Sequence, residues 1–179
     1  PVIPINQCMN WKVMAGKNDT YRGSPVSELR FPTIAEIRYW CFSGAAQGVR
    51  GMFWWSHTRS IQAGHSWING DFAIATREFR DFVDLTAPAH TPTILKQARD
   101  DDVLLALWRH PAGTLLVAAN GSSLEQPLIQ SLEGHVTAAA LQPWGSTRAT
   151  DMAIHSGRLT GGIAQPWEVF VWNVLETTP

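Results

Sequence analysis

The sequence predicts a chain of mixed class, in which an α/β segment at residues 1–88 is followed by an all-β segment at residues 89–179. In the first segment, apolar runs and helical patterns follow one another as strand, loop, helix, strand, loop, helix, which is typical of parallel βα units. In the second, short β-like runs alternate with turn residues and no helical pattern interrupts them, which favours an antiparallel β-sandwich. The change of pattern near residues 88–92 marks the expected domain boundary.

The first expected strand is the apolar run at residues 2–5, where polarity then switches at Asn6 and Gln7. A buried strand that delivers polar groups at its C-terminal end has this pattern. Residues 8–29 have mixed polarity and many turn-forming residues, so we expect a long loop there. Long loops in compact domains are usually functional or disordered, and the presence of Trp11 favours a functional loop.

The first helix is expected to begin after Thr33. A threonine followed three residues later by Glu36 forms a capping-box pattern, in which two otherwise unpaired backbone amides find acceptors. Gly48 is well placed to end the helix in the left-handed conformation. Helical spacing gives this segment one apolar face, which consists of Ile34, Ile37, Trp40, Cys41 and Ala45.

The next strand is expected at residues 51–55, a run too short for a helix and apolar on both faces. A polar cluster at residues 56–59 follows it, and such clusters at the ends of parallel strands commonly carry the chemistry of α/β proteins. Trp54 and Trp55 are adjacent, so we expect them to point to opposite sides of the sheet.

A second loop is expected at residues 61–69, followed by a helix at residues 71–85 that Pro88 helps to end. The apolar face of this helix would consist of Phe72, Ala75, Phe79, Phe82 and Val83. The all-β segment is expected to contain strands at residues 93–97, 103–110, 114–120, 127–132, 136–141, 158–163 and 169–174.

The composition excludes several classes of protein. Apolar residues make up 45% of the chain and charged residues 16%, which supports a real core and argues against disorder or a coiled coil. The net charge is −1 without a basic stripe, so binding to nucleic acid or to a membrane has little support. Cys8 and Cys41 lack the spacing of a metal site, and we expect no metal and no cofactor. Nothing in the sequence indicates the compartment.

Tryptophan is unusually abundant, with nine residues in the chain. Its large flat ring with a single donor suits stacking against sugar rings as well as the filling of cores. We therefore expect most of the tryptophans to pack in cores and some to contact a carbohydrate.

Two βα units cannot cover both faces and both edges of a parallel sheet, whereas eight close into a barrel of roughly 250 residues. Residues 1–88 would be about a quarter of such a barrel, so we expect the sequence to be a piece of a longer protein. The sequence resembles the end of a (β/α)8-barrel glycoside hydrolase, most of all the β-galactosidase-like branch of the retaining clan. The residues that carry this resemblance are Pro1–Gln7, Arg30–Thr33, Glu36, Arg38 and Gly48–Ser56.

The resemblance covers most of the chain in layout, with moderately specific motifs at residues 30–56 and weak ones in the all-β segment. It implies the last two βα units of a TIM barrel plus a C-terminal antiparallel β-sandwich. It also implies hydrolysis of glycosidic bonds in an oligo- or polysaccharide. The expected partners are the carbohydrate substrate and the upstream N-terminal barrel segment of the same enzyme, without nucleic acid or membrane.

Gln7 departs from the family pattern. The resemblance implies that it lies at the end of strand seven, where the family has its nucleophilic glutamate, but a glutamine cannot ionise. The acid/base carboxylate would lie upstream, so the pair that retaining hydrolysis needs, roughly 5 Å apart, is not in this chain. Either both carboxylates come from upstream, or this branch uses another residue, or Gln7 is an engineered replacement, or the protein is not catalytic. We prefer the first alternative.

The residues expected to bind sugar lie at or beside the ends of the last two barrel strands. They are Asn6, Gln7, Trp11, Trp54, Trp55, His57 and Trp67. Each also has a structural interpretation, because the tryptophans could serve packing and His57 could brace a loop. The cluster of Arg30, Glu36 and Arg38 is interpreted as structural: Glu36 serves the capping box, and the arginines form ion pairs at the helix start or with the sandwich.

A second hypothesis belongs to a different class. The chain would be a non-catalytic carbohydrate-binding module, with the sandwich as the binder through Trp108, Trp144 or Trp167. A third is a purely structural domain that joins a barrel to a partner.

Overall fold

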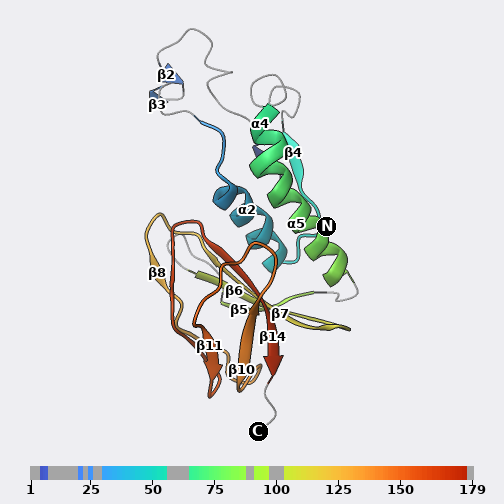
Figure 1. Cartoon of the computed structure of the whole chain (residues 1–179), viewed down its shortest axis with the longest axis vertical. Helices are drawn as coiled ribbons and strands as arrows, with labels where there is room; N and C mark the ends of the chain where they lie inside the picture. The colour runs from blue at the N-terminus through green and yellow to red at the C-terminus, as the bar shows by residue number, and fades with distance from the viewer. Residues whose placement is uncertain are drawn as a thin grey trace.

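A computed structural model describes residues 5–7, 20–21, 24–25, 30–55, 65–87, 91–96 and 103–176. Two long helices lie side by side and pack against one face of a curled antiparallel sheet (Figure 1). A short parallel strand pair lies beside the helices (Figure 1). The fold is therefore an α-containing segment followed by an all-β segment, in the predicted order.

The two short strands β1 (Ile5–Gln7) and β4 (Phe53–Trp55) pair in parallel. Helix α2 (Ile34–Ala46) lies between them in the sequence, so the prediction of a βαβ connection is confirmed. Strand β4 is shorter than predicted and begins at Phe53. The predicted first strand overlaps β1 only at Ile5, since its other residues lie outside those described.

Helix α2 begins with the predicted capping box. The Glu36 amide donates to the Thr33 hydroxyl at 3.3 Å, and the Thr33 amide donates to the Glu36 carboxylate at 2.7 Å. After the helix, Gly48 has a φ of +89°, which is the left-handed conformation expected there.

The buried face of α2 differs from the prediction. Trp40 and Ile34 are only partly buried, whereas Phe42 is fully buried. The face turns toward Phe42 because α2 packs against both α5 and the sheet, so its buried stripe is wider than one row of helical spacing. The buried residues are Ile37, Arg38, Cys41, Phe42, Ala45 and Ala46.

The predicted loops contain more secondary structure than expected. Within the first, β2 (Thr20–Tyr21) and β3 (Ser24–Pro25) form a small antiparallel pair. The second prediction was wrong from residue 65 onward, because α4 (His65–Trp67) and the π-helical turn η2 (Ile68–Phe72) lead into α5 (Ala73–Thr86).

Gly70 explains why the second loop was misassigned. Its backbone has φ −99° and ψ −109°, outside helical values, so the run of helical residues is kinked there. A glycine inside a helical pattern favours the prediction of a loop. The helical segment before Gly70 is also too short to show a helical pattern of its own.

The all-β segment forms one eight-stranded sheet in the order β5-β6-β7-β14-β10-β11-β12-β9, with β13 and β8 as a separate pair. Every pairing within this sheet is antiparallel. The strands are β5 (Thr93–Lys96), β6 (Val103–His110), β7 (Gly113–Asn120), β8 (Gln126–Pro127), β9 (Gln130–Ser131), β10 (Ala139–Pro143), β11 (Ala153–His155), β12 (Arg158–Thr160), β13 (Ile163–Ala164) and β14 (Val169–Glu176).

Most predicted strands are confirmed, with shifts at their ends. Strand β11 was missed, because three residues give too short a pattern. The predicted strand at 127–132 is split between β8 and β9, and the one at 158–163 between β12 and β13.

Both faces of the sheet centre are buried, and the side chains of β6 alternate between two cores. Leu104, Ala106 and Trp108 belong to the core shared with α2 and α5. Leu105 and Leu107 belong to a second core that the curled strands β10 to β14 enclose. Because the helices and the sheet share one core, the two predicted segments pack as neighbours. The division at residues 88–89 itself stays a prediction.

Among the helices that the structure describes, none combines the length and apolar character required to cross a membrane.

Candidate functional site

The parallel strand pair brings four of the predicted sugar-binding positions into register. Asn6 is paired with Trp54, and Gln7 is paired with Trp55. The ends of these two strands therefore meet at one edge, as the sequence predicted. The side chains of Asn6, Gln7 and Trp55, and the residues Trp11 and His57, lie outside what the structure describes.

The side chain of Trp54 faces the helices. It is partly buried against the helix–sheet core and meets the ring of Phe72 edge-on, with centroids 5.1 Å apart. Its neighbour Phe53 is 57% exposed, on a strand whose side chains alternate between faces. Among the described residues, β4 therefore presents one exposed apolar side chain, that of Phe53, on the face opposite the helices.

Trp67 is anchored by contacts on more than one side. Its indole N–H donates to the carbonyl oxygen of Pro32 at 2.7 Å, and its ring stacks on Phe31 with centroids 4.6 Å apart. It also contacts Phe72, at 5.1 Å between centroids. Trp67 and Trp54 are therefore joined through Phe72. The indole of Trp67 ties α4 to the segment that leads into α2, and its role in sugar binding stays a prediction.

The tryptophans of the alternative hypothesis lie between the sheet and the helices. Trp108 is 1% exposed and packs edge-on against Phe82, so it cannot contact a carbohydrate. Trp144 packs against Phe42 and Phe82, which leaves it partly buried. Trp167 is half-buried and meets Tyr39 edge-on. Binding through Trp108 is therefore excluded, whereas a sugar-binding role for Trp144 or Trp167 stays a prediction.

A buried polar cluster surrounds Arg38, whose ion pairing was predicted at the helix start or with the sandwich but whose partner, Glu78 of α5, was not. The guanidinium of Arg38 donates to both carboxylate oxygens of Glu78 at 2.9 Å, and these side chains are 8% and 6% exposed. Arg38 also donates to the carbonyl oxygen of Val169 at 3.0 Å, and the Ser146 amide donates to Glu78 at 3.0 Å. The cluster therefore joins α2, α5, the first residue of β14 and the turn after β10.

A local signal for this cluster exists in the sequence. Arg38 stands four residues from both Ile34 and Phe42, and Glu78 stands between Ala75 and Phe82 at helical spacing. Charged residues within two apolar faces are rarely buried unless they are paired. The pattern could indicate that Arg38 and Glu78 are both buried, but not that they form an ion pair with each other.

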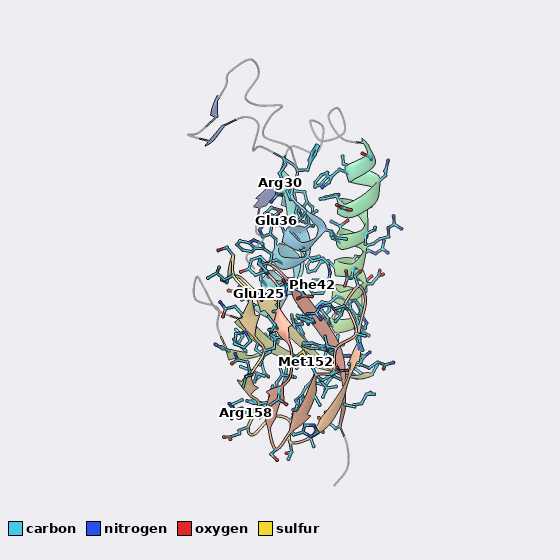
Figure 2. All side chains as sticks on the ribbon, turned by 60° about the vertical axis from the view of Figure 1, so that its left-hand side comes forward. Arg30, Glu36, Phe42, Glu125, Met152 and Arg158 are labelled. Atoms are coloured by element: carbon cyan, nitrogen blue, oxygen red, sulfur yellow. The ribbon has the colours of Figure 1, made fainter. Side chains whose placement is uncertain are left out.

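The charged cluster at the start of α2 has the structural role that the sequence predicted. Arg30 donates to Glu36 at 2.7 and 2.8 Å, and Figure 2 shows the two side chains together at this end of the helix. The hydrogen bonds from Arg30, together with those from Thr33, lower the pKa of Glu36 from its ordinary value of 4.5 to about 2. Glu36 is therefore a cap and an ion-pair partner, ionised over most of the pH range.

Nothing in the described part of the chain groups three or more histidines, cysteines or acidic residues closely enough to hold a metal ion. Cys41 is a free thiol, and burial raises its pKa to about 12. Such a thiol is a core residue rather than a nucleophile.

Comparison with known proteins gives matches at the level of structure alone. No protein-family model matches the chain, and no curated protein matches it. An α-amylase from Geobacillus thermoleovorans, solved in complex with acarbose, superposes with a TM-score of 0.59 at 11% identity, over 97% of this chain and 38% of that one. A Bacillus halodurans protein assigned as an α-N-acetylgalactosaminidase superposes at 0.57 and 10% identity, over 86% and 35%.

A Bacteroides fragilis protein assigned as an α-galactosidase also matches, with a TM-score of 0.52 at 7% identity, over 97% of this chain and 33% of that one. At such identities the likeness shows the fold. The chain spans about a third of the length of these glycoside hydrolase structures.

Proposed function

We propose that this chain is the C-terminal part of a glycoside hydrolase that acts on an oligo- or polysaccharide. The observation that carries the proposal is the order and packing of its parts: a parallel βαβ unit, a second helix and a curled antiparallel sheet around one shared core. The likeness to about a third of several glycoside hydrolase structures supports it.

In this proposal, residues 1–88 are the last two βα units of a (β/α)8 barrel, and residues 89–179 are its C-terminal β-domain, of sandwich type. The open face of β4 supports the barrel. Phe53 is 57% exposed there, and within the described residues no further strand pairs with either edge of β1 and β4. The upstream barrel segment of the same enzyme would cover this face and both edges.

The sugar site would lie at the C-terminal ends of β1 and β4, where barrel enzymes have their active sites. Asn6, Gln7 and His57 would hydrogen-bond sugar hydroxyls, because amide and imidazole groups both donate and accept. Trp55 and Trp11 would offer rings to the apolar faces of the sugar. Trp54 and Trp67 would support this wall from the helix side, through their contacts with Phe72.

The two catalytic carboxylates would come from the upstream segment, since glutamine occupies position 7. On the sequence motifs at residues 30–56, we assign the enzyme to the β-galactosidase-like branch and expect retention of anomeric configuration. Retention requires the carboxylates to lie roughly 5 Å apart.

Substitution at the proposed site in the full-length protein tests the proposal. Trp55→Ala should lower kcat/KM on aryl glycosides by about twofold to tenfold, since one aromatic contact contributes about 0.5–1.5 kcal/mol beyond its burial. Trp40→Ala is the matched control, because Trp40 is a partly buried tryptophan on α2. Equal kcat/KM in both folded variants would refute the proposed site.

A further inference from the structure

A cavity of about 310 Å³ lies between the start of α2 and the sheet, and none of its described lining residues belongs to β1 or β4. One wall comes from α2, and the other comes from the segment after β10 and the segment before β14. The lining residues are Ile34, Ala35, Arg38, Ser146, Gln165, Pro166, Glu168 and Val169. Its volume lies at the lower end of the range for small-molecule sites, which is about 300–1,000 Å³.

The lining combines apolar surface with hydrogen-bonding groups. Ile34, Ala35 and Pro166 provide apolar side chains, whereas Ser146 and Gln165 each carry groups that both donate and accept. Ser146 and Gln165 are exposed. A ligand that fits this lining has apolar faces and a rim of hydroxyl groups.

The charges that line the cavity are already neutralised within the protein. Arg38 is paired with Glu78 at 2.9 Å. Glu168 is paired with Arg148 at 2.6 Å and also accepts from the backbone N–H of Gln165 at 2.8 Å. An ionic ligand would lose hydration without gaining an unpaired counter-charge, so the cavity favours a neutral ligand.

Arg38 retains donor capacity toward such a ligand. Its contacts with Glu78 and Val169 use three of the five N–H groups of the guanidinium. Within the described part of the chain, no acceptor is assigned to the other two. A buried guanidinium of this kind can donate to a hydroxyl without any change in its ion pair.

We propose that this cavity is a second carbohydrate site, which takes one or two rings of a neutral sugar. Other neutral polyols would also match this lining. We choose a sugar because the chain is proposed to be part of a glycoside hydrolase, so this choice rests on the proposed function. In a βα unit the helix begins near the C-terminal end of the preceding strand, so the cavity lies toward the side of the proposed active site. It would hold a distal part of a saccharide chain.

Fluorine NMR of the full-length protein labelled with 5-fluorotryptophan tests this site. Trp167 lies between the lining residues Pro166 and Glu168, and its resonance can be assigned from the spectrum of Trp167→Phe. The protein is titrated with glucose, galactose, maltose and lactose, and with glucuronate as the charged comparison. At least one neutral sugar should shift the Trp167 resonance in a saturable way, and glucuronate should bind more weakly.

Gln165→Ala should weaken that titration about fivefold to tenfold, which is the size expected for one or two lost hydrogen bonds. Gln142→Ala makes the same change at an exposed position of β10 that does not line the cavity, and it should have no effect. Ala35→Phe should abolish binding by filling the cavity. Thermal unfolding confirms that each variant is folded.

The proposal is overturned if no neutral sugar shifts the Trp167 resonance, if glucuronate binds as well as they do, or if Gln165→Ala and Gln142→Ala titrate alike. Hydrolase activity and the response of the Trp167 resonance together distinguish a failure of the proposed function from a failure of this site. A protein without hydrolase activity whose Trp167 resonance still responds to sugar would contradict the enzyme and leave this site standing. An active hydrolase without the response would contradict the site alone.

Discussion

Arg38 and Glu78 form a buried ion pair across 40 positions of the sequence, with two hydrogen bonds of 2.9 Å between guanidinium and carboxylate. The pair joins α2 to α5. Through Ser146 and Val169 it also fixes both helices to the sheet. The strands next to these helices carry the proposed sugar-binding residues, so the pair is expected to position them as well.

Removal of one partner should be strongly destabilising. Arg38→Met leaves the Glu78 carboxylate buried without its partner, and we expect a loss of about 3–5 kcal/mol in the free energy of unfolding. Arg30→Met is the matched control, because its pair with Glu36 is exposed on the arginine side and should contribute about 0–1 kcal/mol. Denaturant unfolding measures both. Similar losses in the two variants would contradict the role given to the buried pair.

Simultaneous removal of both partners should cost less than the sum of the single changes. In Arg38→Met/Glu78→Met no buried charge remains, and apolar replacements of buried ion pairs are often close to neutral. Because the double change should cost little, the double-mutant cycle with Arg38→Met and Glu78→Met should give a coupling energy at least as large as the single loss, about 3 kcal/mol or more. Additive losses would show that the two side chains act independently.

Gly145 should not tolerate a side chain. Its φ is +59°, and a Cβ built on it would overlap Oε1 of Glu78, which the ion pair holds in place. Gly145→Ala should thus cost about 1–3 kcal/mol more than the backbone strain alone. Gly134→Ala isolates the strain, because Gly134 has φ +75° and a Cβ there meets no described atom within 4 Å. Equal melting temperatures for the two variants would argue against the close contact with Glu78.

The cap of α2 should give a pH-dependent stability. The pKa of Glu36 is lowered from 4.5 to about 2, so the folded state favours the ionised carboxylate. Its contribution is fully present above pH 4.5 and is lost as the pH falls toward 2. The difference in unfolding free energy between the native protein and Glu36→Gln should therefore shrink over this interval. A difference that stays constant from pH 6 to pH 2 would exclude this linkage.

Cys41 should be inert to thiol reagents in the folded protein. Burial is the main cause that raises its pKa to about 12, and the thiolate is the reactive form. In a Cys8→Ala variant, Ellman's reagent should react with Cys41 only as fast as the protein unfolds, and at once in denaturant. Rapid reaction under native conditions would mean that this part of the core opens readily.

Local patterns could be predicted from the sequence, and long-range contacts could not. The capping box at Thr33 and Glu36 depends on residues three positions apart, and it is present as predicted. The partner of Arg38 could not be predicted, because Glu78 lies on another helix whose position depends on the whole core. Phe42 was missed for the same reason, since only the sheet and α5 together make its side of α2 a buried face.

In the candidate site, too, some features could be predicted from the sequence and others could not. The meeting of two strand ends follows from the parallel pairing that the order of elements implies, and Asn6 and Gln7 lie in register with Trp54 and Trp55. That Trp54 faces the helices could be recognised only from the position of Phe72, whose ring it contacts. The cavity beside Arg38 could not be predicted, because its two walls come from residues more than a hundred positions apart.

The central claim is that this chain supplies one wall of a sugar site whose catalytic carboxylates lie on another part of the same enzyme. The most direct measurement is the turnover of 4-nitrophenyl glycosides of α- and β-linked glucose and galactose by the 179-residue chain, with and without the preceding barrel segment. We expect hydrolysis of at least one substrate by the longer protein and none above background by the chain alone. Comparable turnover by the isolated chain, or none by the longer protein on any of the four, would contradict the claim.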